Sequence, residues 1–235
     1  MLIYIFSGVI ECYGLSVDWI SNHVYWTDSG KRTVEIANYD GSGRRLLVSS
    51  GLEKPRGIVV DPIFKYVFWA DQGTRKIERS ALDGTERRVL VPDGLQWTNQ
   101  LAISYATRRL YWSESGVHTL HYGHITSSNR RELTYLSGSD VFGMAVFDQV
   151  LFYSDWYTNS VYMVDMITGD QETIASHLSR PTSIVIYHPT DLKKDNLCAE
   201  DTCSDVCVPV PRSYHCTCHP GSKLAADGKN CILSE

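Results

Sequence analysis

The stretch Tyr25-Trp26-Thr27-Asp28 decides the fold, because related stretches recur along the chain at nearly constant spacing. The other copies are Phe68-Trp69-Ala70-Asp71, Tyr111-Trp112-Ser113-Glu114 and Phe152-Tyr153-Ser154-Asp155. They begin at residues 25, 68, 111 and 152, so the steps between them are 43, 43 and 41 residues. A period of about 40–45 residues is typical of a β-propeller, in which each repeat forms one four-stranded blade.

The residues around each signature repeat as well. Short apolar runs precede the signatures, and they are Leu15-Ser16-Val17, Ile58-Val59-Val60, Leu101-Ala102-Ile103 and Met144-Ala145-Val146. Asp40-Gly41 and Asp83-Gly84 add hairpin turns after the third strand of a repeat. Each repeat therefore predicts an inner strand buried on both faces, the signature strand, a third strand, a tight turn and an outer strand. A further run, Ile184-Val185-Ile186, predicts a final inner strand over residues 182–187.

Composition excludes several classes of protein. The net charge of −5 is small and the basic residues are scattered, which disfavours a nucleic-acid-binding surface. The chain contains no apolar run of 18 residues, so we expect no membrane span within it. The first ten residues, MLIYIFSGVI, fit either a signal segment or a strand.

Two longer stretches make the family resemblance specific. Gly14-Leu15-Ser16-Val17-Asp18-Trp19 and Lys54-Pro55-Arg56-Gly57-Ile58-Val59-Val60-Asp61 resemble the YWTD β-propeller of the low-density-lipoprotein-receptor-related family, and the resemblance extends from about Gly14 to the end of the chain. It implies an all-β fold with six blades followed by an epidermal-growth-factor-like (EGF-like) module.

The chain carries only four signatures, so we expect an N-terminally truncated fragment. Four of six blades would form an open arc over residues 1–190, and the EGF-like module would occupy residues 191–235. Such an arc would expose the apolar faces of its first and last blades. A closed four-bladed ring is the alternative.

The signature residues look structural rather than catalytic. Their carboxylates occur once per blade at the end of a buried strand, where they can accept hydrogen bonds from backbone amides, and the resemblance implies that they tie neighbouring blades together. The motif residues are Tyr25, Trp26, Asp28, Trp69, Asp71, Trp112, Glu114 and Asp155. Glu114 and Ser104 replace the more usual Asp, so we expect the third repeat to be less regular.

A candidate ligand face lies at one mouth of the propeller, where the residues that lead into the inner strands should gather. Aromatic and Arg side chains are the types that anchor protein ligands. The candidates are Lys54, Arg56, Trp97, Asn99, Asp140, Phe142, Trp156 and Arg180. Trp97-Thr98-Asn99 resembles the family's Trp-Pro-Asn-Gly stretch, which implies a surface for protein ligands. The alternative is that Trp97 and Trp156 only cover the seams between blades.

His118, His121 and His124 are three residues apart. On one strand, His121 would point away from the other two, so they are poorly placed to share a metal ion.

Six of the seven cysteines lie between Cys198 and Cys231, which predicts a disulfide framework and an extracellular location; Cys12 is left over. Six cysteines allow fifteen pairings. Their resemblance to an EGF-like module implies Cys198–Cys207, Cys203–Cys216 and Cys218–Cys231. We expect no cofactor. Calcium is disfavoured because Asp195-Asn196-Leu197 lacks the usual Glu or Gln beside the first cysteine, and because Pro209 stands where an Asp or Asn is expected and offers no side-chain oxygen. Zinc is disfavoured because the cysteine spacing does not match a zinc site.

The leading hypothesis is a non-enzymatic receptor module that binds or releases secreted proteins, such as lipoproteins, yolk proteins or Wnt-type factors, on the cell surface and in endosomes. It would act beside the other domains of a larger receptor, or be secreted if expressed alone. The alternatives are an adhesion scaffold of nidogen type in the matrix and a metal-dependent lactonase, for which Glu11, Asn99 and Asp140 form too loose a set.

Overall fold

The computed structural model describes residues 8–92, 94–136, 140–186, 198, 202–210, 213–219 and 221–234. Most of the first ten residues, the calcium-related stretch 195–197 and the predicted boundary at residue 190 lie outside the described residues. The described residues form twenty strands and contain no helix that is long and apolar enough to cross a bilayer.

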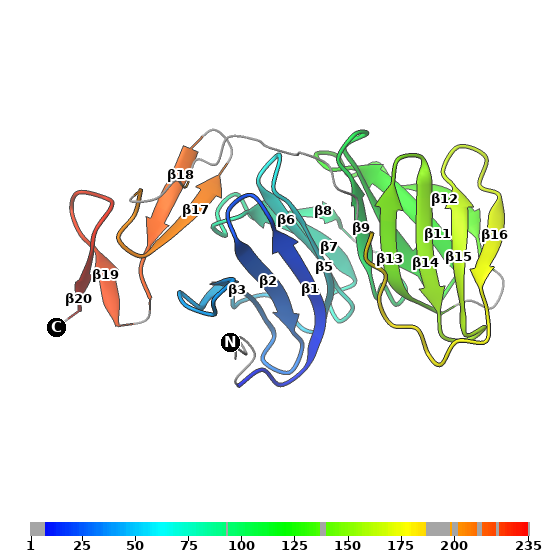
Figure 1. Cartoon of the computed structure of the whole chain (residues 1–235), viewed down its shortest axis with the longest axis horizontal. Helices are drawn as coiled ribbons and strands as arrows, with labels where there is room; N and C mark the ends of the chain where they lie inside the picture. Colours follow the sequence, from blue (N-terminus) through cyan, green and yellow to red (C-terminus); the bar gives the residue numbers. More distant parts are fainter. Residues whose placement is uncertain are drawn as a thin grey trace. The chain divides into compact units, whose positions relative to one another are not determined.

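Sixteen strands form four antiparallel sheets of four strands each, in sequence order within each sheet (Figure 1). The first sheet contains β1 (Cys12–Asp18), β2 (His23–Asp28), β3 (Thr33–Asn38) and β4 (Arg45–Val48). The second contains β5 (Pro55–Asp61), β6 (Tyr66–Asp71), β7 (Lys76–Ala81) and β8 (Arg88–Val91). The third contains β9 (Leu101–Ser104), β10 (Arg109–Glu114), β11 (Thr119–His124) and β12 (Arg131–Tyr135). The fourth contains β13 (Val141–Phe147), β14 (Val150–Asp155), β15 (Ser160–Asp165) and β16 (Gln171–Ala175). These are four propeller blades, and every signature lies on the second strand of its blade, as the spacing predicts.

The chain divides into two compact units. The first contains Met1–Phe68, Arg79–Arg88 and Leu192–Glu235, and the second contains Trp69–Glu78 and Val89–Asp191.

In the first unit, β1 packs closely against β5. Gly14 makes this possible, because a Cβ atom at this position would lie 2.4 Å from the carbonyl oxygen of Arg56 and 2.9 Å from the backbone nitrogen of Ile58. The Val60 N–H donates to the Ser16 hydroxyl at 3.0 Å. Backbone contact at this distance requires small side chains on the β1 face that meets β5.

The opposite face of β1 departs from the prediction that inner strands are buried on both faces. Leu15 and Val17 are 47% and 37% exposed, whereas the equivalent Ile58 and Val60 of β5 are 3% and 1% exposed. The difference arises because β1 covers Ile58 and Val60, while no described residue covers Leu15 and Val17 to the same extent. Burial on both faces is therefore wrong for β1, whereas the exposed apolar face of this first blade is what the open-arc prediction implies.

In the second unit, the third and fourth blades share a hydrophobic core. Its most buried members come from the signature strands and the third strands of the two blades and include Tyr111, Leu120, Leu151, Tyr153 and Val164. Tyr153 also stacks on Tyr162, with 4.9 Å between the ring centroids. The aromatic residues of the signatures thus supply much of the buried apolar surface that stabilises the blades.

The predicted final inner strand does not form. Residues 181–186 are irregular, and Tyr187 lies outside the described residues. The segment still lies against β13, since a Cβ atom on Gly143 would be 2.8 Å from the Cα of Ser183. A strand needs a hydrogen-bonding neighbour, and no described strand pairs with this segment. The segment therefore has the position of an inner strand but lacks the backbone hydrogen bonds of one.

The cysteine-rich module consists of two small hairpins. The first joins β17 (Val206–Val210) to β18 (Ser213–Thr217), and the second joins β19 (Ser222–Leu224) to β20 (Cys231–Leu233). The disulfides are Cys198–Cys207, Cys203–Cys216 and Cys218–Cys231, the pairing that the resemblance implies. Cys12 is a free thiol.

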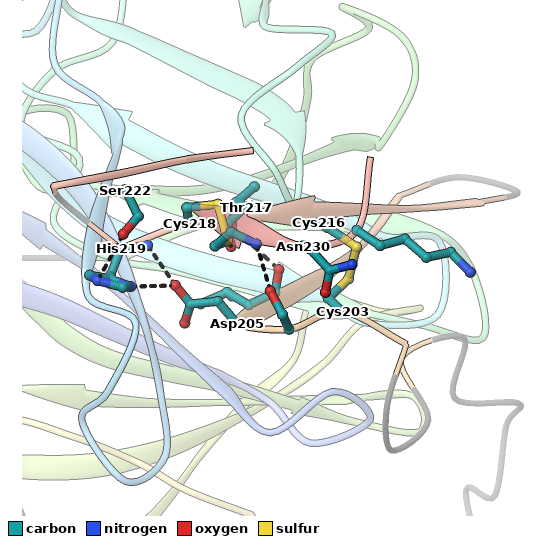
Figure 2. The surroundings of a disulfide bond; sticks show 12 residues. Cys203, Asp205, Cys216, Thr217, Cys218, His219, Ser222 and Asn230 are labelled. Carbon is teal, nitrogen blue, oxygen red and sulfur yellow. Dashed lines mark hydrogen bonds and ion pairs between the residues drawn. A yellow bond between two sulfur atoms is a disulfide. The ribbon is translucent and has the colours of Figure 1, made fainter. Parts of the chain in front are cut away.

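His219 connects the two hairpins of the module (Figure 2). Its ring Nδ1 lies 2.8 Å from a carboxylate oxygen of Asp205, and its backbone N–H donates to the same oxygen at 2.6 Å. On the other side of the ring, Nε2 lies 3.1 Å from the Ser222 hydroxyl. Because Asp205 precedes β17 and Ser222 begins β19, these contacts supplement the disulfides in a module with little core.

The module also contacts the blades of the first unit. His215 forms an ion pair with Asp83, which lies in the turn between β7 and β8. Val206 and Val208 are 1% and 0% exposed. A Cβ atom on Gly43 would lie 2.4 Å from a methyl group of Val206, so the first blade supplies part of this cover.

Candidate functional site

The signature carboxylates hold backbone amides, as a structural role requires. Asp28 accepts hydrogen bonds from the N–H groups of Ile10, Glu11 and Lys31 at 3.0–3.1 Å. Burial raises the pKa of Asp28, but these hydrogen bonds outweigh it and lower the pKa overall. Asp155 similarly accepts from the Asp140 N–H at 2.7 Å. Asp28 and Asp155 therefore secure the segments that enter the inner strands of their own blades.

Hydroxyl groups in the first signature and directly after it donate hydrogen bonds to the next blade. The Thr27 hydroxyl donates to the Arg56 carbonyl, and the Ser29 hydroxyl donates to the Pro55 carbonyl. These bonds complement the close approach at Gly14 and fix the first blade against β5.

Glu114 takes the place of the signature aspartate in the third repeat. Its longer side chain accepts from the Gln96 N–H at 3.1 Å through one oxygen, and through the other it contacts the Trp112 indole N–H at 3.0 Å and the Arg130 guanidinium at 2.8 Å. Beside it, burial and the charge of Arg130 lower the pKa of His121 to about 4. Both carboxylate oxygens of Glu114 are thus engaged in structural contacts.

The three histidines have separate surroundings. His118 precedes β11 and meets the ring edge of Tyr135. His121 stacks on Trp112, and His124 contacts the Thr126 hydroxyl at 2.8 Å. Among the described residues, no group of three or more His, Cys, Asp or Glu side chains is arranged to hold a metal ion.

Within the second unit, several ligand-face candidates contact one another. Phe142 and Trp156 stack with ring centroids 3.5 Å apart, and the Arg180 guanidinium lies 5.6 Å from the Trp156 ring centroid. The Asn99 amide donates to the Asp140 carboxylate at 3.4 Å. The segment before β9, the start of β13 with the residue before it, the turn after β14 and the segment after β16 therefore form one polar and aromatic patch.

Trp97 belongs to the same unit but is far more open. Its side chain is 65% exposed, and its backbone has a left-handed φ of 56°. The Ser115 N–H donates to the Trp97 carbonyl at 3.3 Å, which anchors the backbone while the indole faces solvent. An exposed indole on an anchored backbone is suited to contact a partner.

The remaining two candidates lie in the first unit. The Arg56 guanidinium lies 4.1 Å from the ring centroid of Tyr13, a cation–π contact that orders both side chains. Lys54 is exposed in the loop before β5.

Sequence reasoning missed several residues of the second unit. Tyr157 is 75% exposed beside Trp156. Gln72, Arg75 and Gln96 line a cavity together with Trp97. Gln72 and Arg75 lie in the turn after the signature strand β6. A comparison of the four turns that follow the signature strands could have identified these two positions from the sequence.

The fold and these contacts define a YWTD-type propeller with a disulfide-bonded EGF-like module. The family model "Low-density lipoprotein receptor repeat class B" matches residues 22–62 and 65–103. The chain belongs to the low-density-lipoprotein-receptor-related family.

Individual relatives show the extent of the similarity. The chain is 41% identical to human low-density lipoprotein receptor-related protein 8 over 93% of its length. It is 38% identical to mouse low-density lipoprotein receptor-related protein 5 over 97% of its length. It spans only 24% and 14% of these two proteins. A solved structure of a nidogen/laminin complex contains a chain with 32% identity and a TM-score of 0.71, and the alignment covers 75% of the present chain and 68% of that one.

Proposed function

We propose that this chain is a non-enzymatic extracellular receptor module that binds secreted proteins through a ligand face on its second unit. This face contains Trp97, Asn99, Asp140, Phe142, Trp156 and Arg180. Lys54 and Arg56 of the first unit are further candidates. The observation that carries the proposal is the 65% exposure of the Trp97 indole on an anchored backbone.

Physical chemistry supports this choice of surface. Aromatic and Arg side chains dominate binding energies at protein interfaces because they bury much area at a small entropic cost. Trp156 is already ordered by its stack with Phe142, so a ligand would find part of the surface preorganised. The relatives are named receptor-related proteins, which favours a location at the cell surface as part of a larger receptor. Endosomes are the further location that we propose.

The relatives' names suggest which partners to test. Low-density lipoprotein is the ligand in the family name, and laminin is the partner in the similar solved complex. Yolk proteins and Wnt-type factors remain further proposals. A laminin ligand would favour the matrix-scaffold alternative, for which the nidogen similarity is the specific observation.

The test is a binding assay with the full secreted chain immobilised and low-density lipoprotein, laminin, a yolk protein and a Wnt protein in solution. The variants Trp97→Ala and Phe142→Ala remove ligand-face aromatics. Ile167→Ala is the matched control, since Ile167 is 73% exposed at the other end of β15 from Trp156. We expect at least one ligand to bind and to lose about tenfold or more in affinity in the first two variants. Binding that Ile167→Ala weakens equally, or no binding by any ligand, would overturn the proposal.

A further inference from the structure

A cavity of about 440 Å³ opens beside Trp97 within the second unit. The turn after β6, the segment before β9 and the turn after β10 surround it. Its lining residues are Gln72, Arg75, Leu95, Gln96, Trp97 and Gly116. Arg75 is the charged residue among them, and the lining contributed by the described residues contains no carboxylate.

The backbone around the cavity is held by hydrogen bonds. Asp71 accepts the N–H groups of Gly73 and Thr74 at 2.9 and 3.0 Å, which closes the turn that presents Arg75. The Gly116 N–H donates to the Gln96 carbonyl at 3.2 Å. A Cβ atom on Gly116 would lie 2.9 Å from the Cβ of Gln96, so glycine permits this close approach. The walls are therefore preformed.

Arg75 is anchored in a way that leaves most of its donors available. Its Nε donates to the Leu95 carbonyl at 2.9 Å, which fixes the plane of the guanidinium. No described residue accepts a hydrogen bond from either terminal Nη nitrogen of Arg75. A guanidinium held at Nε can offer its Nη donors to a planar acceptor, and carboxylate is the common partner of this geometry.

The other lining residues complement such a ligand. Gln72 and Gln96 carry amides that can donate to a carboxylate or pair with a peptide group. Leu95 is buried at the base and the Trp97 indole is exposed at the rim, so apolar contact is available beside the charge. The nearby Glu114 is paired with Arg130 and does not neutralise Arg75.

We infer that this cavity binds an Asp or Glu side chain of a partner polypeptide, with the carboxylate on Arg75 and a neighbouring apolar side chain against Trp97. The inference rests on the proposed function, because it names the chemistry that the ligand face accepts. The volume suits one or two side chains of a protruding segment.

The experiment uses the full chain labelled with 5-fluorotryptophan and observed by ¹⁹F NMR, with the Trp97 resonance assigned from a Trp97→Phe variant. The probes are the blocked tripeptides acetyl-Leu-Asp-Leu-amide and acetyl-Leu-Asn-Leu-amide. We expect the aspartyl peptide to shift the Trp97 resonance with a Kd on the order of 1 mM and the asparaginyl peptide to bind roughly tenfold more weakly. In Arg75→Gln, the affinity for the aspartyl peptide should fall to the affinity that the wild type has for the asparaginyl peptide.

Arg32→Gln is the matched control. Arg32 occupies the equivalent turn of the first blade with the same left-handed backbone, φ 59° against 58° for Arg75, and lies outside the cavity. Equal binding of the two peptides, an unchanged affinity in Arg75→Gln, or no shift at about 10 mM peptide would overturn the inference.

The two proposals fail separately. Suppose that Trp97→Ala abolishes binding of a protein ligand, that Arg75→Gln still binds it, and that the wild type binds the two peptides equally. The ligand face is then supported and the carboxylate site is wrong. If the peptides are distinguished but no protein ligand binds, the site stands and the proposed function fails.

Discussion

Acidification should destabilise the first blade through His23. This residue lies on β2, where it is 2% exposed. Burial, followed by the charge of Arg45, lowers its pKa to about 4, while a hydrogen bond with Asn38 opposes the shift. In the unfolded chain, a histidine has a pKa of about 6.5. Between these values the unfolded state binds more protons, so stability is complete above about pH 6.5 and falls as the pH drops toward 4.

The size of the effect follows from the two pKa values. Lowering the pH from about 7.5 to about 5.5 should cost about 1.3 kcal/mol through this one side chain. The variant His23→Gln keeps a polar group near Asn38 but cannot titrate, so it should lack this contribution. Whatever other groups contribute, the wild type should lose about 1.3 kcal/mol more than the variant over this pH interval.

The assay is urea unfolding of the full chain at both pH values, followed by tryptophan fluorescence. His177→Asn is the control, because His177 is exposed and has a left-handed φ of 60°, which Asn tolerates. If His23→Gln loses as much stability on acidification as the wild type, His23 does not reside in the environment described above.

Three further predictions concern contacts of the first unit. Gly14→Ala should destabilise the chain by about 1–3 kcal/mol in urea unfolding, because its Cβ would meet the Arg56 carbonyl oxygen at 2.4 Å; an unchanged midpoint would contradict the close packing of β1 on β5. Asp28→Asn should cost about 1–3 kcal/mol, because the amide loses acceptor capacity for the N–H groups that Asp28 holds; wild-type hydrogen exchange at residues 10 and 11 would refute this role. His215→Ala should lower the free energy of unfolding by at most about 1 kcal/mol, since His215 is half-exposed. It should nevertheless speed hydrogen exchange in β17. Unchanged exchange there would mean that the ion pair with Asp83 does not hold the module.

The repeat architecture could be predicted because it is encoded locally. The 43-residue spacing, the buried aromatic residues of the signatures and the Asp-Gly turns all specify strands that pair with their neighbours in sequence. The disulfide pairing required the family resemblance as well, because spacing alone leaves fifteen possibilities.

Contacts between distant segments were harder to predict. The cavity joins Arg75 to Trp97, and the turn that carries Arg75 has no unusual composition. Each blade holds one non-glycine residue with a left-handed φ in this turn, and these are Arg32, Arg75, His118 and Asn159. Asparagine and histidine are enriched in this conformation, but the two arginines are not, so the sequence conceals a regular feature of the backbone in the first two blades.

The inner strands show how a correct pattern can give a wrong detail. Residues 184–186 have the apolar composition of a strand, but strand formation also needs a hydrogen-bonding neighbour. Leu15 and Val17 have the composition of a buried strand, and their exposure follows only when the four signatures are compared with the six blades that the family resemblance implies. Both properties depend on distant parts of the fold, which a local pattern does not specify.

Oxidative footprinting of the ligand face would test the central claim most directly. The full chain would be exposed to hydroxyl radicals with and without a ligand that binds in the panel, and oxidation would be quantified by mass spectrometry. We predict that Trp97 and Tyr157 become protected while Ile167 stays as reactive as in the free chain. Protection of Ile167, with Trp97 and Tyr157 still fully reactive, would place the ligand on another surface and contradict the account.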